Sequence, residues 1–299
     1  SSGADLMYDI ESLYEATSVA DACRALAEDE RAEVIAGGTD ALVKLREGKG
    51  APAHLVSIHG LGDELDGVRL LDDGTVWVGP ITWFHHVTIS PIIQQTVPVL
   101  GDACDTPGGP QLRVSGTIGG NVCSAATSAD SASTLYAYGA LLDVESVRGK
   151  RTIPIEEWYA GPGRSHKERD EVLTGIRIPR ENYEGFTGHY FKYGKRRALE
   201  ITTMGCCCLV KLGEDKHTID DIRLAFGVAG PTPMRAIAAE DAVRGTDVAK
   251  AAERIGELAC ACTNPRDSWR ASKDFRIQLI KEMSKRSLIY AARKGGADI

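Results

Sequence analysis

The stretch from Thr117 to Asp130, TIGGNVCSAATSAD, restricts the fold of this chain more than any other part of its sequence. It holds two adjacent glycines, and after Val122 only small residues precede the carboxylate of Asp130. Because large apolar side chains are missing at strand or helix spacing, we predict neither an ordinary core strand nor an amphipathic helix here. Such small side chains let another group approach the backbone closely, so the sequence predicts a close contact along this stretch.

The composition is that of a globular protein with one large or two ordinary domains. The chain has 299 residues, of which 43% are apolar and 26% charged, enough to bury a sizeable core. Its net charge of −7 argues against a nucleic-acid partner. No apolar run reaches the roughly 18 to 20 residues of a membrane span, and the first residues lack a signal-peptide layout. We therefore expect a cytoplasmic protein without a membrane span.

The eight cysteines do not form a metal-binding pattern. No pair has the C-x-x-C spacing of zinc ribbons or of most iron–sulfur sites. Cys206, Cys207 and Cys208 are consecutive, so in a strand they alternate between two faces as small buried residues. His85 and His86 lie in a helical pattern and are interpreted as surface or packing residues. The sequence predicts no metal in this chain.

Helical and strand patterns alternate along the first part of the chain, which predicts an α+β fold. Residues 18–29 carry apolar side chains at helical spacing after Ser18, a favoured N-cap residue. Residues 82–104 are predicted to form helical segments that Pro91 and Pro98 interrupt. Further helices are expected at 40–50 and 132–140, and strands at 32–38, 54–58, 75–80 and 171–179, with a hairpin at 141–155.

A polar break from Pro179 to Gly185 separates a second part of the chain. Three strands are expected after it, at 188–196, 203–212 and 222–230. Two helices follow, at 249–262 and 272–294. This order of strands and then helices predicts a second, smaller α+β domain.

A first glycine turn follows the strand predicted at 32–38 and precedes a helix. Gly37 and Gly38 let backbone N–H groups point outward together, and a helix N-terminus attracts an anion. No lysine follows the glycines as in a P-loop, and the G-x-G-x-x-G pattern is absent. A tight turn in which Thr39 or Asp40 caps the helix remains an alternative reading.

A second glycine turn, Gly116 to Asn121, strengthens the anion interpretation. A diphosphate has two phosphoryl groups and is long enough to be held from two sides, one by each turn. The small residues from Cys123 to Ala129 leave room for an extended cofactor along the backbone. Asp130 either accepts hydrogen bonds from ribityl or ribose hydroxyls or serves as N-cap of the next helix.

Several motifs together resemble the FAD-binding subunit of molybdenum hydroxylases. They are AGGTD, GPQLRVSGTIGGN, ATSADSA, VESVRGKRTIPI and FKYGKRRALEI, in this order and spacing. The resemblance runs from about Met7 to the C-terminus and is greatest to the separate flavin subunit of bacterial xanthine dehydrogenases. It implies a vanillyl-alcohol-oxidase or PCMH-type FAD-binding domain at residues 7–182, in subdomains of about 7–60 and 61–182. A small α+β C-terminal domain is implied at 186–296.

The resemblance also implies which residues bind FAD. The first pyrophosphate loop matches Glu33, Val34, Ile35, Ala36, Gly37, Gly38, Thr39 and Asp40, and the second matches Gly116, Thr117, Ile118, Gly119, Gly120 and Asn121. Asp130 matches an acidic cofactor contact, Val172 an apolar residue beside the flavin, and Lys192 a lysine at the end of the flavin ring. No catalytic acid, base or nucleophile is expected, because the cofactor carries the chemistry.

Two short segments of this chain differ from animal members of the family. Where some of them carry an aromatic flavin contact, this chain has Pro107 or Gly108. Where they have acidic residues after the lysine motif, this chain has Ala198, Leu199 and Glu200. The cysteine-rich insertion that holds an extra iron–sulfur cluster in one branch of the family is also missing from this sequence. The resemblance therefore implies the same cofactor with different electrostatic tuning.

The implied function is electron transfer through FAD, from [2Fe-2S] clusters on one partner subunit to NAD or another acceptor. A second partner would carry molybdopterin, in a heterotrimer that can dimerise, and the organic substrate would be xanthine or a related purine. A stand-alone flavin oxidase of the same fold and a module that only binds a nucleotide remain open alternatives. The polar loop Gly161 to Glu171 borders the nicotinamide site or is a plain surface loop.

Overall fold

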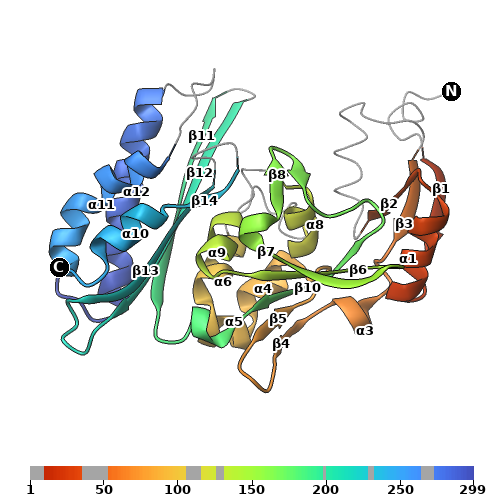
Figure 1. Ribbon diagram of the computed structural model, residues 1–299, viewed down its shortest axis with the longest axis horizontal. Helices are drawn as coiled ribbons and strands as arrows, with labels where there is room; N and C mark the ends of the chain where they lie inside the picture. The colour runs from red at the N-terminus through yellow and green to blue at the C-terminus, as the bar shows by residue number, and fades with distance from the viewer. Residues whose placement is uncertain are drawn as a thin grey trace.

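The computed structural model describes residues 10–35, 53–105, 116–125, 131–197, 200–227, 232–263 and 273–299, and the statements below refer to these. Three larger sheets follow one another along the chain, and the third stands between a group of helices and the rest of the molecule (Figure 1). The N-terminal sheet and the C-terminal helices lie at opposite ends. This mixture of sheets and helices confirms the predicted α+β class.

The N-terminal unit is a three-stranded parallel sheet covered by helix α1. Its strands β1 (Ile10–Glu15), β2 (Ala32–Ile35) and β3 (Ala53–Ser57) have the order β1-β3-β2, so β2 is an edge strand. Helix α1 (Val19–Glu28) begins after Ser18, whose side chain accepts a hydrogen bond from the N–H of Asp21, as predicted. It buries Val19, Ala22, Cys23 and Leu26.

The middle unit is a five-stranded antiparallel sheet with helices on one side. Its order is β4 (Val68–Leu70), β5 (Val76–Val78), β10 (Val172–Ile178), β6 (Leu141–Ser146) and β7 (Gly149–Pro154). The predicted hairpin is formed by β6 and β7. The remaining elements are α3 (Gly62–Leu65), α4 (Phe84–Ile89), α5 (Pro91–Thr96), α6 (Pro98–Asp105), α8 (Ile118–Cys123), α9 (Ala132–Ala137), β8 (Tyr159–Gly161) and β9 (Arg164–Ser165), with 3-10 turns η1 (Ile155–Glu157) and η2 (Arg180–Asn182). Pro91 and Pro98 begin their helices, where proline costs no intrahelical hydrogen bond.

The C-terminal unit is a four-stranded antiparallel sheet, one strand more than predicted. It contains β11 (Thr187–Arg197), β12 (Glu200–Leu212), β13 (Ile219–Gly227) and the short β14 (Met234–Arg235). Helices α10 (Ile237–Val243), α11 (Val248–Cys262) and α12 (Lys273–Lys294) cover one face. None of the helices in the described residues combines the length and apolarity that a bilayer crossing needs.

The three consecutive cysteines show which way each face of this sheet points. Cys206 and Cys208 belong to the core beneath α10, α11 and α12. Cys207 is buried with Tyr190 in the core of the middle unit, on the opposite face. The alternation predicted for a strand is therefore present, and it places the Cys207 face against the middle unit.

Candidate functional site

The second glycine turn is a short helix. Residues Ile118–Cys123 form α8, with Thr117 as its N-cap. The sequence predicted neither an ordinary core strand nor an amphipathic helix here, and α8 is neither, because it buries its two glycines as well as Ile118 and Val122. Ile118 and Val122 are the large side chains that α8 buries, and the glycines between them bring the backbone close to its neighbours.

Gly119 is required by close packing rather than by its backbone angles. A Cβ atom at this position would lie 2.4 Å from the backbone oxygen of Pro80 and 2.7 Å from its Cα. The Gly119 N–H donates to the same Pro80 oxygen at 2.8 Å. Gly119 is not among the glycines with positive φ, so its backbone angles do not require a glycine. No larger residue fits while this contact persists.

The N–H groups of the turn are already hydrogen bonded within the protein. The Ile118 N–H donates to the backbone oxygen of Thr82, and the Gly119 N–H donates to that of Pro80. The Gly120 N–H donates to the side-chain hydroxyl of Thr117, and the Asn121 N–H donates to the backbone oxygen of Thr117. Outward-pointing N–H groups, on which the anion argument rested, are therefore not found at these four positions. What this turn offers a ligand is a backbone without bulky side chains and the half-buried side chain of Asn121.

The first glycine turn is described only through the strand that leads into it. Glu33, Val34 and Ile35 lie in β2, while Ala36, Gly37, Gly38, Thr39 and Asp40 lie outside the described residues, as does Asp130. Val34 packs against a core cluster that contains Val172 and Ile81. Because Ile81 follows Pro80, this cluster reaches the segment on which α8 rests. The structure thus brings together β2, Val172 and α8.

Lys192 lies on the face of the C-terminal sheet that is turned toward the middle unit. It pairs with Gly205 on β12 and shares its face with Tyr190, two residues before it. A Cβ atom on Gly205 would lie 3.0 Å from the Tyr190 hydroxyl and 3.5 Å from Oγ of Ser133 in α9. The face of Lys192 is therefore directed at α9, which follows the stretch from Thr117 to Asp130.

Among the buried hydroxyl groups in or next to α9, Oγ of Ser133 and the hydroxyl of Tyr159 have no hydrogen-bond partner within the described residues. Ser133 is 1% exposed and Tyr159 is 8% exposed. The Tyr159 ring lies 5.9 Å from that of Tyr136 in α9. Burial raises the pKa of Tyr159, with a contribution from Tyr136, so its hydroxyl keeps its proton and can donate. Neither residue was expected from the sequence, because no motif distinguishes a buried hydroxyl that lacks a partner.

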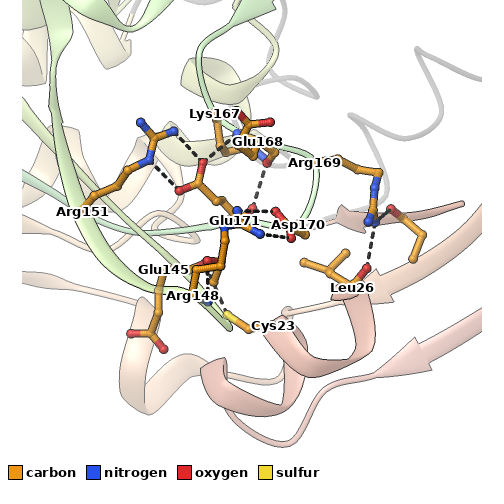
Figure 2. A network of polar contacts seen from close by, with 12 residues as sticks. Cys23, Leu26, Glu145, Arg148, Arg151, Lys167, Glu168, Arg169, Asp170 and Glu171 are labelled. Atoms are coloured by element: carbon orange, nitrogen blue, oxygen red, sulfur yellow. Dashed lines mark hydrogen bonds and ion pairs between the residues drawn. The ribbon is translucent and has the colours of Figure 1, made fainter. Parts of the chain in front are cut away.

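The polar loop Gly161 to Glu171 is fixed by ion pairs, as Figure 2 shows. Arg151 donates to both carboxylate oxygens of Glu171 at 2.7 Å, and the Glu168 N–H donates to one of them at 2.7 Å. Arg148 pairs with both oxygens of Asp170. Burial alone would raise the pKa of Glu171, but these hydrogen bonds outweigh it and the pKa lies below the ordinary value.

The other residues considered for chemistry do not gather into a site. Among the described residues, no three His, Cys, Asp or Glu side chains are placed to hold a metal ion. Cys23, Cys104, Cys123 and the remaining five cysteines are unbridged thiols. Burial raises the pKa of the Cys206 thiol to about 12, so it stays protonated.

Comparison with known families shows which protein family this chain belongs to. Residues 8–181 match the family described as the FAD binding domain in molybdopterin dehydrogenase, and residues 189–291 match the CO dehydrogenase flavoprotein C-terminal domain. The chain belongs to this family, as the motif resemblance implied. It is an FAD subunit of molybdenum-hydroxylase-type oxidoreductases.

Individual relatives match almost the full chain. The putative xanthine dehydrogenase FAD-binding subunit XdhB of Escherichia coli (strain K12) is 39% identical over 294 residues, which cover 98% of this chain and 100% of that protein. The carbon monoxide dehydrogenase medium chain of Hydrogenophaga pseudoflava is 28% identical, over 86% and 88% of the two chains. A solved structure of carbon monoxide dehydrogenase from Hydrogenophaga pseudoflava has a TM-score of 0.87 at 29% identity and covers 96% of this chain and 99% of its own. The predicted fold is thereby confirmed.

Proposed function

We propose that this chain is the FAD-carrying electron-transfer subunit of a xanthine or purine dehydrogenase complex. Electrons would come from [2Fe-2S] clusters on one partner subunit and leave to NAD or another acceptor. The observation that carries this proposal is the similarity over 98% of the chain to a putative xanthine dehydrogenase FAD-binding subunit. The organic substrate would be oxidised at molybdopterin on a second partner, in a cytoplasmic heterotrimer that can dimerise.

We propose that FAD binds beside α8 and α9. When bound, FAD accepts single electrons and passes on a hydride, which links one-electron centres to a two-electron acceptor. We assign the first pyrophosphate loop to residues 33–40, the second to 116–121, and further contacts to Asp130, Val172 and Lys192. Gly119 supports this assignment by letting α8 pack directly on Pro80, which holds the turn in place. Lys192 would stabilise negative charge at the ring end.

The two unpartnered hydroxyls test whether a polar ligand fits here. A buried hydroxyl without a partner is costly, and such groups in native proteins usually meet a ligand, an ion or water. Ser133 lies in α9 near the face that carries Lys192, and Tyr159 packs against Tyr136 of the same helix. A dinucleotide carries many hydroxyl, phosphate and ring acceptors, so these residues fit the cofactor that the family implies.

We further propose the domain division expected from the sequence. The FAD-binding domain would span residues 7–182, in subdomains of about 7–60 and 61–182, and the C-terminal domain would span 186–296. Separate buried clusters support this division: one around α1 and β3, one under the five-stranded sheet, and one beneath α10, α11 and α12. The face of β12 that carries Cys207 joins the middle cluster, so the C-terminal domain would form one wall of the cofactor site.

Two measurements on the purified full-length chain test this function. We expect a flavin absorption spectrum and release of FAD, at one molecule per chain, on denaturation. We also expect oxidation of NADH with artificial electron acceptors but no turnover of small organic substrates by the chain alone. A colourless protein that takes up no FAD would refute the cofactor assignment. Turnover of an organic substrate without partners would instead support a stand-alone flavin oxidase.

A further inference from the structure

Strand β2 precedes the first glycine pair in the sequence, and among the described strands it has a neighbour on only one side. It pairs with β3, and the Ile58 N–H at the end of β3 donates to the Ile35 oxygen at 2.9 Å. Carbonyl groups alternate in direction along a strand, so the Ala32 oxygen, three residues earlier, points away from β3. A group from outside this sheet can therefore bind the open edge of β2.

Arg169 is the group that holds it. Its Nη1 donates to the backbone oxygens of Leu26 at 2.9 Å, Asp29 at 3.0 Å and Ala32 at 3.0 Å. Figure 2 shows its side chain reaching from the polar loop toward the end of α1. Helix α1 has no basic residue in its last turn, so Arg169 also supplies the positive charge that a helix C-terminus favours.

The backbone of Arg169 is itself held by ion pairs of the two residues after it and by hydrogen bonds of the two residues before it. The next two residues, Asp170 and Glu171, are bound by Arg148 and Arg151, which extend from the hairpin of β6 and β7. Lys167 donates to the oxygens of Glu168 and Glu171 at 3.0 Å. Because the loop is already ordered by these contacts, Arg169 loses little additional freedom when it binds the three carbonyl groups.

We infer that Arg169 is a positioning residue for FAD, acting through β2. It ties the start of β2, and with it the approach to the first glycine turn, to the five-stranded sheet of the neighbouring subdomain. This inference rests on the proposed function, because the turn at residues 36–40 is assigned to the FAD diphosphate there. It gives the polar loop a role distinct from both a nicotinamide border and a plain surface loop.

Glu64 provides a matched control at the other end of α1. Its Oε2 accepts a hydrogen bond from the Val19 N–H at 3.0 Å, so it also joins the N-terminal unit to residues beyond 60. Like Arg169, it binds main-chain groups of α1 through a charged side chain. Among the described residues, Glu64 has no hydrogen bond or ion pair with β2. Loss of Glu64 therefore weakens the same boundary without releasing the strand.

The test compares FAD affinity with stability in the full-length chain. The dissociation constant for FAD and the unfolding temperature of the apoprotein are measured for wild type, Arg169→Ala, Arg169→Lys and Glu64→Ala. We expect Arg169→Ala to raise the dissociation constant about tenfold, the loss expected for hydrogen bonds from one charged group. Arg169→Lys should give an intermediate value, because lysine keeps the charge but not the geometry of the guanidinium group. Glu64→Ala should change the constant by less than about twofold at a similar loss of unfolding temperature.

A second measurement separates positioning from general damage. Guanidinium ion at millimolar concentration, well below denaturing levels, should restore FAD affinity to Arg169→Ala and leave Glu64→Ala unchanged. Equal losses of affinity in Arg169→Ala and Glu64→Ala, or wild-type affinity in Arg169→Ala, would overturn the inference while leaving the proposed function intact. If wild type itself binds no FAD, the proposed function fails first.

Discussion

The turn at α8 is assigned to the proposed cofactor site, and the polar loop Gly161 to Glu171 is inferred to position another part of it, but the two are held by different forces. The turn is held by packing, since Gly119 touches the backbone of Pro80 and the first-turn N–H groups are bonded inside the protein. The loop is held by charge, through Arg148, Arg151 and Arg169.

This difference predicts two kinds of sensitivity. Close packing between neutral groups depends little on pH or salt and fails when an atom is added. Ion pairs tolerate changes of shape but weaken when a partner is removed, protonated or screened. Variants in the two regions should therefore be distinguishable by the conditions under which they fail, and the four predictions below follow from this contrast.

The largest effect is expected from Gly119→Val in the packed turn. Its side chain would overlap the Pro80 backbone, which is expected to cost about 3 kcal/mol or more of unfolding free energy and to abolish FAD retention. Denaturant unfolding and the flavin absorbance of the purified protein measure both effects. Gly62→Ala is the control, because nothing lies within 4 Å of a Cβ atom there. Full FAD occupancy in Gly119→Val would show that the turn is not part of the site.

The next largest effect is expected from Arg151→Ala in the charged loop. The Glu171 side chain is only 3% exposed and would lose its cationic partner, whereas Arg151 is 46% exposed. Breaking a fully buried pair costs about 3–5 kcal/mol, so we expect about 2 kcal/mol here. Urea unfolding measures the loss. Adding Glu171→Gln to Arg151→Ala should recover part of it, and a double variant less stable than the single one would contradict this assignment.

A smaller effect is expected from Lys192→Ala, which tests whether the packed region also orients the flavin ring. Most FAD should remain bound, because the glycine turns are untouched. The midpoint potential should fall by about 30 mV, equivalent to about 1.4 kcal/mol for two electrons, since a cation near the ring stabilises the reduced flavin. A spectroelectrochemical titration measures this shift. An unchanged potential would remove Lys192 from the ring end.

The smallest effect is expected from Arg148→Ala, because Arg148 is 56% exposed. Hydrogen bonds from Arg148 hold the pKa of Asp170 below its ordinary value in the folded protein. The stabilisation is therefore present above the unfolded pKa of about 3.9 and is lost as the pH falls through the folded pKa. The difference in unfolding temperature between wild type and Arg148→Ala should be present near neutral pH and should disappear in acid. A difference that grew in acid would contradict the ion-pair account.

Local patterns in the sequence were sufficient for much of the fold. The N-cap at Ser18, the buried face of α1 and the helix breaks at Pro91 and Pro98 depend on neighbouring residues, and each was predicted. The opposite orientations of Cys206 and Cys207 follow from strand alternation in the same way. The FAD-binding family was recognisable because several motifs occur in one order.

The parts that were missed depend on contacts between distant residues. Arg169 and Ala32 are separated by 137 positions, so no local pattern reveals their hydrogen bond. Helix α8 forms because Gly119 packs on Pro80, which only the folded chain brings together. The unpartnered hydroxyls of Ser133 and Tyr159 likewise become apparent only once burial is known.

The most direct test of the central claim is native mass spectrometry of the endogenous protein, combined with metal analysis. The account predicts a defined assembly that contains this chain, FAD, iron and molybdenum, with two other subunits in equal numbers. A stable monomer that carries only FAD and fully turns over an organic substrate would contradict it.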